Sequence, residues 1–129
     1  MSGYLLDTHV LLWAGTGSSR LPGATTAILE DPGTDVRFSV VSLWEIVIKS
    51  QLGRSDFRAD PEALRAHARL AGMPELQITA EHVLGVMRLP ALHRDPFDRL
   101  LVAQARVEGL ILLTADRAVL EYGPGVSPA

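Results

Sequence analysis

The sequence predicts an α/β fold with a mostly parallel central sheet. Short apolar runs, each followed by a polar residue, alternate with longer stretches of helical periodicity, a pattern typical of parallel strands joined by helices. The chain has 129 residues, the size of one domain, and 47% of them are hydrophobic, which suffices for one buried core. We find no repeat or long linker, so residues 1–129 are interpreted as a single domain.

Four apolar runs are interpreted as buried strands, because each is short and continuous rather than alternating. They cover residues 4–6, 36–41, 76–78 and 110–113. Parallel strands require crossover connections, and the ligand crevice of such a sheet lies beyond the carboxyl ends of its strands.

The segments between these runs carry helix signals. Asp60 and Asp95 each precede a proline, the pattern of an N-cap followed by proline at the first helical position. Thr79 is a further candidate N-cap, and Gly109 is placed to end a helix over residues 96–108.

Composition excludes several classes of protein. There is no cysteine, which rules out disulfides and thiolate metal sites, and no apolar run reaches the roughly 18 residues of a membrane span. The N-terminus lacks the pattern of a signal peptide, so we expect a cytoplasmic protein. The net charge of −3 argues against nucleic-acid binding by bulk attraction, and Lys49 is the single lysine.

Three acids lie at positions where a functional role has to be considered. Asp7 and Asp116 follow the first and last apolar runs. Taken alone, Asp7 is explained at least as well as a helix cap, and Asp116 is explained better as an ordinary turn acid. Asp98 falls within the apolar arc of the predicted helix 96–108, where a carboxylate is costly without a cation or hydrogen bonds. Asp95 already caps that helix, which favours a functional role for Asp98.

Glu45 is ambiguous. It stands three residues after Ser42, as in a capping box, and four residues before Lys49, as in a helical ion pair. Structure alone explains both features, so its functional interpretation depends on the other acids. Together, acids at strand ends and helix starts can converge on one crevice, where their mutual repulsion favours bound Mg²⁺ or Mn²⁺. Such ions serve phosphoryl chemistry.

Four stretches of the chain resemble the PIN-domain nucleases, and most closely the VapC-type toxins of prokaryotic toxin–antitoxin pairs. The stretches are residues 5–13 with Asp7, residues 39–49 with Glu45, residues 93–105 with Asp98, and residues 113–116 with Asp116. They span nearly the whole chain in order, and the second and third together are specific to one branch of the family. The fourth position is the most variable in the family.

The resemblance implies a three-layer α/β/α sandwich that cleaves single-stranded or loop RNA with Mg²⁺ or Mn²⁺. It implies that Asp7 and Asp98 are the main metal ligands, that Glu45 and Asp116 complete the site, and that Thr114 supports a bound water. It also implies a cognate antitoxin and a homodimer or toxin–antitoxin hetero-oligomer. Asp95 lies close enough to Asp98 to share its role.

One other interpretation stays open, and two further classes of protein are discounted. The alternative without catalysis is a silent PIN-like module that binds RNA or protein. A haloacid-dehalogenase phosphatase would need an acid where His9 stands, and a receiver-like domain would need a lysine after a late strand. The histidines, His9, His67, His82 and His93, are interpreted as structural or surface residues. Arg94, Arg99 and Arg117 lie near the acids and could contact RNA phosphates, but ordinary solvated surface is the favoured interpretation for each.

The helix that follows residues 36–41 is apolar over an arc of about 200°, against roughly 100° for a one-sided helix. We therefore expect it to be buried on two sides. Trp44 or its neighbours could also contact an antitoxin or a second subunit.

Overall fold

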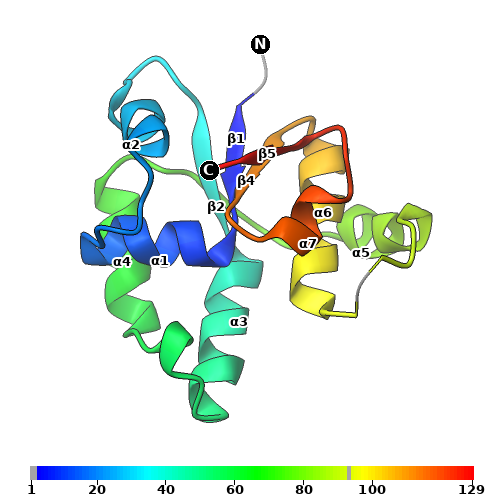
Figure 1. Cartoon of the computed structure of the whole chain (residues 1–129), viewed down its shortest axis with the longest axis horizontal. Helices are drawn as coiled ribbons and strands as arrows, with labels where there is room; N and C mark the ends of the chain where they lie inside the picture. Colours follow the sequence, from blue (N-terminus) through cyan, green and yellow to red (C-terminus); the bar gives the residue numbers. More distant parts are fainter. Residues whose placement is uncertain (1–2, 93) are drawn as a thin grey trace.

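The computed structural model describes residues 3–92 and 94–129. Five parallel strands form one sheet in the order β3-β2-β1-β4-β5, with helices on both faces (Figure 1). The strands are β1 (Tyr4–Leu6), β2 (Val36–Ser39), β3 (Glu75–Leu76), β4 (Ile111–Thr114) and β5 (Val126–Pro128). The predicted α/β/α sandwich with a parallel central sheet is confirmed.

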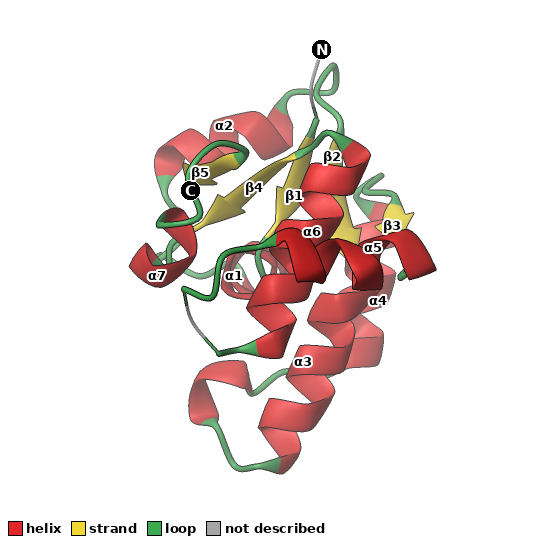
Figure 2. Ribbon diagram, turned by 90° about the vertical axis from the view of Figure 1, so that its right-hand side faces the viewer, coloured by secondary structure: helices red, strands yellow, loops and turns green. Residues whose placement is uncertain are grey.

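Seven α-helices and two short 3-10 helices connect the strands in the described parts of the chain. The α-helices are α1 (Thr8–Thr16), α2 (Gly23–Glu30), α3 (Val40–Gln51), α4 (Pro61–Leu70), α5 (Ala80–Gly85), α6 (Pro96–Glu108) and α7 (Arg117–Leu120), and the 3-10 helices are η1 (Ser55–Phe57) and η2 (Val86–Arg88). Figure 2 shows α5 and α6 on the face of the sheet nearer the viewer, with α1 and α4 behind it.

The caps predicted at Asp60, Asp95, Thr79 and Gly109 are confirmed. The carboxylates of Asp60 and Asp95 accept backbone hydrogen bonds from the first turns of α4 and α6, and Thr79 caps α5. Gly109 ends α6 with a φ of 68°, a left-handed conformation that costs glycine little.

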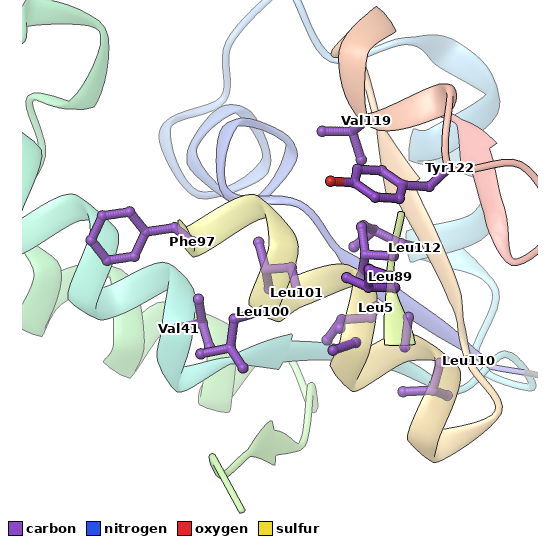
Figure 3. Packing of buried hydrophobic residues seen from close by; sticks show 13 residues of the cluster. Leu5, Val41, Leu89, Phe97, Leu100, Leu101, Leu110, Leu112, Val119 and Tyr122 are labelled. Carbon is purple, nitrogen blue, oxygen red and sulfur yellow. The ribbon is translucent and has the colours of Figure 1, made fainter. Parts of the chain in front are cut away.

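Two apolar clusters fill the space on the two sides of the sheet. Leu5 pairs in register with Leu112, and both belong to the cluster beneath α6 (Figure 3). Leu6 pairs with Leu113, and both belong to the cluster beneath α1 and α4. Successive residues of a strand point to opposite faces, so continuous leucine runs supply both clusters. Each fully buried leucine contributes roughly 1.5–3 kcal/mol to folding.

Several element boundaries differ from those predicted. β2 ends at Ser39 and α3 begins at Val40, inside the run interpreted as strand to residue 41. The third strand covers Glu75–Leu76 rather than residues 76–78. Strand β5 has no clear signal in the sequence.

Helix α3 is less buried than its apolar arc predicts. Trp44 is 47% exposed and Val47 is 37% exposed, so the expectation of burial on two sides within this chain is wrong for this part of the helix. Trp44 packs edge-to-face on Phe97 of α6, with ring centroids 4.6 Å apart, and leaves its other surface open. Within the described residues, no helix has the length and apolarity needed to cross a membrane.

Candidate metal centre

The predicted acids meet where the parallel strands end. α1, α3 and α7 begin directly beyond the carboxyl ends of β1, β2 and β4 (Figure 1). A cavity of about 140 Å³ lies at these ends. All four predicted acids line it, namely Asp7, Glu45, Asp98 and Asp116, and so do Asp95 and Lys49.

Asp7 is both a helix cap and a cavity acid, so the two interpretations left open by the sequence are compatible. Its Oδ1 accepts a hydrogen bond of 2.7 Å from the backbone N–H of Thr8. Its Oδ2 accepts one of 2.5 Å from the hydroxyl of Thr114. Burial raises the pKa of Asp7, although these two hydrogen bonds act in the opposite direction. The Thr114 hydroxyl thus bonds directly to the Asp7 carboxylate, whereas the resemblance implied that it supports a bound water.

Glu45 does not form the capping box that its spacing suggests. Ser39 caps α3, and Ser42 lies one turn inside the helix, where its hydroxyl is 3.0 Å from that of Thr8. The Glu45 side chain is buried, with 2% of the residue exposed. Its Oε1 accepts a hydrogen bond of 2.5 Å from Thr8. The predicted ion pair with Lys49 is present, with Nζ and Oε2 2.6 Å apart.

Lys49 also binds a second carboxylate. Its Nζ lies 2.7 Å from Oδ2 of Asp95, whose other oxygen caps α6. Burial alone would lower the pKa of Lys49, but its hydrogen bonds to Asp95 and Glu45 outweigh burial and raise it. Burial acts to raise the pKa of Asp95. The hydrogen bond from Lys49 and the backbone hydrogen bonds from the start of α6 outweigh burial, so the pKa of Asp95 is lowered.

Asp98 is half-buried at the start of α6 and faces the cavity, as its place on the helical wheel predicts. Burial, followed by the nearby negative charge of Asp7 and then of Asp95, raises the pKa of Asp98 to about 8. Single oxygens of Glu45, Asp95 and Asp98 all lie within 4.8 Å of one another. The structure therefore brings Asp95 into the same group as Asp98 rather than separating the two.

Asp116 has the most peripheral position of the four predicted acids. It is exposed, and its carboxylate caps the short helix α7 through the N–H of Ala118. Its backbone N–H donates to the hydroxyl of Thr114, which in turn donates to Asp7. Asp116 lines the mouth of the cavity, and like Asp7 it lies outside the group of oxygens formed by Glu45, Asp95 and Asp98.

A comparison with protein families finds a match over most of the chain. The model of the PIN domain matches residues 4–123 of the chain. The chain belongs to the PIN-domain family. No curated protein sequence matches it significantly.

Solved structures share the fold of this PIN domain. A toxin–antitoxin complex from Klebsiella pneumoniae contains a chain with 19% identity and a TM-score of 0.65, covering 97% of this chain and 96% of that chain. VapBC2 from Rickettsia felis, bound to a DNA fragment from their promoter, has 14% identity and a TM-score of 0.67, covering 98% and 96%. FitAcB from Neisseria gonorrhoeae has 19% identity and a TM-score of 0.57, covering 92% and 91%.

The donor atoms of the PIN-domain cavity suit a hard divalent cation. The acidic side chains offer carboxylate oxygens, the ligands that Mg²⁺ and Mn²⁺ prefer over the nitrogen and sulfur ligands typical of Zn²⁺. The raised pKa of Asp98 means that the metal-free site resists full ionisation. A bound divalent cation would offset both the burial of these charges and their mutual repulsion, which together produce this resistance.

One edge of the cavity is aromatic and basic, which sequence reasoning missed. The ring of His9 lies 4.5 Å from that of Phe57 and 6.0 Å from that of Trp13, measured between centroids. The Arg54 guanidinium sits 5.3 Å from the Phe57 ring and pairs with Asp56. The i,i+4 spacing of His9 and Trp13 on one helix was the available signal.

The remaining predicted roles have mixed outcomes. His82 is structural, as predicted, because it is fully buried and bonds to Glu108. His93 lies outside the described residues. The expectation of ordinary solvated surface is wrong for Arg99, whose guanidinium donates to the carbonyl of Pro90 and to the hydroxyl of Tyr122.

Proposed function

We propose that this PIN domain is a Mg²⁺- or Mn²⁺-dependent endoribonuclease, and that it acts as the VapC-type toxin of a toxin–antitoxin pair in the cytoplasm. The observation that carries the proposal is the convergence of carboxylates in one small cavity, where burial and then the charges of the neighbouring acids raise the pKa of Asp98 to about 8. A fold gains little from collecting like charges in this way, whereas a metal-dependent active site requires it.

The residues have distinct parts in the proposed reaction. Asp7 and Asp98 are the proposed main metal ligands, with Glu45 and Asp116 completing the site. A divalent ion held there would ready a water for attack on a phosphodiester and stabilise the negative charge that builds on the phosphate. Asp7 and Glu45 are fixed by buried hydrogen bonds from Thr114 and Thr8, so their oxygens need little reorganisation when the cation binds.

The aromatic and basic edge supports a single-stranded substrate. Unstacked bases of single-stranded or loop RNA bind to aromatic faces, and phosphates bind to guanidinium groups. His9 and Arg54 line the same cavity as the acids, so a base and a phosphate could contact this edge beside the reacting phosphodiester. The overall charge of −3 makes such local contacts necessary, because bulk attraction to RNA is weak.

The proposed partners are a cognate antitoxin and a second copy of the chain. The fold similarity to chains of toxin–antitoxin complexes supports the antitoxin. The exposed Trp44 and Val47 of α3 offer an apolar surface for either contact.

The decisive experiment is cleavage of labelled structured RNAs on a denaturing gel, with Mg²⁺, Mn²⁺ or EDTA, by the wild type and Asp7→Asn. Metal-dependent cleavage that disappears in Asp7→Asn is expected. Cleavage that persists in Asp7→Asn would overturn the assigned site. No cleavage of several RNAs by folded protein in either metal would favour the silent binding module.

A further inference from the structure

Lys49 is the single lysine of the chain, and its ammonium group lies inside the acidic cavity. The side chain is 14% exposed. Its Nζ lies 2.6 Å from an oxygen of Glu45 and 2.7 Å from an oxygen of Asp95. A charge withdrawn from water to this extent requires close partners of opposite charge, and Lys49 has two.

Two aromatic rings restrict where the ammonium group can go. Nζ lies 4.7 Å from the centroid of Phe57 and 5.5 Å from that of Phe97, so the rings add cation–π attraction to the two ion pairs. Phe57 and Phe97 are themselves buried. Swinging the ammonium out to solvent would break both ion pairs and both ring contacts at once.

The position of Nζ coincides with a place that a metal ion could otherwise use. Oxygens of Glu45, Asp95 and Asp98 lie within 4.8 Å of one another, a spacing that suits ligands of one cation. Lys49 already contacts two of these three carboxylates. A divalent ion bound between Glu45 and Asp95 would have to displace the ammonium or accept strong repulsion from it.

We propose that the ammonium group of Lys49 is a built-in cation that occupies the position between Glu45 and Asp95 and limits the centre to one divalent ion, held through Asp7 and Asp98. The inference rests on the proposed function in that it assumes a divalent-metal site. Lys49 is a positioning residue here: it holds Glu45 in place and neutralises part of the acidic charge without contacting the substrate.

The test counts bound metal rather than activity. Mn²⁺ is titrated into the full-length protein, and free Mn²⁺ is measured by electron paramagnetic resonance at room temperature. Wild type should bind one Mn²⁺ per chain. Lys49→Met removes the charge but keeps an unbranched chain of similar length, and should bind a second Mn²⁺. Lys49→Arg keeps the positive charge and should bind a single Mn²⁺, like the wild type. If the role of Lys49 were purely structural, the wild type, Lys49→Met and Lys49→Arg would all bind the same number of Mn²⁺ ions.

A matched control removes a positive charge elsewhere. Arg58 is exposed and does not line the cavity, so Arg58→Met should keep a single Mn²⁺. Two Mn²⁺ ions in the wild type, or one in Lys49→Met, would overturn the role of Lys49 and leave the nuclease proposal intact. No Mn²⁺ in the folded wild type would overturn both. If Lys49→Met fails to fold, Lys49→Gln takes its place, because it also removes the positive charge and should likewise bind a second Mn²⁺; one ion in folded Lys49→Gln would contradict the inference.

Discussion

Thr8 and Glu45 are joined by a hydrogen bond of 2.5 Å between Oγ1 and Oε1, although they are 37 residues apart in the chain. Both side chains are buried. The Thr8 hydroxyl also lies 3.0 Å from that of Ser42, and because it has one proton, it donates to the carboxylate and accepts from Ser42. This contact fastens the start of α1, and therefore Asp7, to the acid carried by α3.

We expect Thr8→Val to lower the free energy of unfolding by about 1–3 kcal/mol, because it leaves a buried carboxylate oxygen without its donor. Thr8→Ser keeps the hydroxyl and should lose less stability. Urea denaturation of both variants in EDTA measures the difference. Equal losses in Thr8→Val and Thr8→Ser would show that the methyl group, and not the hydrogen bond, carries the stabilisation.

The pKa of Asp98 predicts how stability depends on pH. Its pKa is raised in the folded protein from 3.8 to about 8, so folding favours the protonated form. The stabilisation that protonated Asp98 gives to the folded state is fully present below about pH 4 and is lost as pH rises through about 8. Asp7, whose pKa is also raised, acts in the same direction. We expect metal-free protein to lose stability between pH 5 and 8, on the order of 1–3 kcal/mol.

We expect Asp98→Asn to remove much of this pH dependence and to be as stable as the wild type, or more stable, in EDTA at about pH 8. The reason is that asparagine keeps the size of the side chain and removes a charge that burial and the neighbouring acids disfavour. Thermal unfolding in EDTA across the pH range checks this. Asp116→Asn is the control, because Asp116 lies at the exposed mouth of the cavity. Strong destabilisation of Asp98→Asn in EDTA would mean that Asp98 is a structural cap.

The positions of Asp7 and Asp116 predict unequal effects on cleavage. Asp7 is buried and fixed by two hydrogen bonds, whereas Asp116 is exposed and caps a short helix. We expect Asp7→Asn to reduce kcat/KM more than about 100-fold and Asp116→Asn only about 10-fold, the range typical of residues that support metal ligands. Gel assays under saturating Mn²⁺ would measure both. Similar losses in the two variants would place Asp116 among the main ligands.

The sequence predicts the location of the acids better than their contacts. Strand and helix patterns indicated that Asp7, Glu45 and Asp98 approach one edge of the sheet, because the carboxyl ends of parallel strands lie together. Their roles as ligands stay predictions. The link from Lys49 to Asp95 spans 46 residues, and no local pattern encodes such a distance.

The boundary between β2 and α3 shows a second limit of local reasoning. Apolar residues continue from the strand into the helix, so periodicity does not reveal that the helix begins at Val40. The sequence pattern therefore indicates Ser42 as the N-cap of α3, whereas the N-cap is Ser39, three residues earlier. Tertiary packing decides the boundary: Ser39 is buried and contacts Gln104 of α6.

Gln104 organises a buried polar network that its apolar neighbours concealed in the sequence. Its Oε1 accepts a hydrogen bond of 2.5 Å from Ser39, and its Nε2 donates to the carbonyl of Gln77 at 3.3 Å. The same Nε2 lies 3.2 Å from Nδ1 of the fully buried His82. One amide thus joins the cap of α3, the loop after β3, and α5.

We expect Gln104→Leu to lower the free energy of unfolding by about 1–3 kcal/mol, because it leaves buried polar groups without partners while keeping nearly the same volume. The matched control is Gln51→Leu, the same substitution at an exposed position at the end of α3, which should change stability by less than about 0.5 kcal/mol. Urea denaturation measures both variants. Comparable small changes would show that the network specifies local geometry without stabilising the fold, since a buried amide that stabilises must cost more to remove than an exposed one.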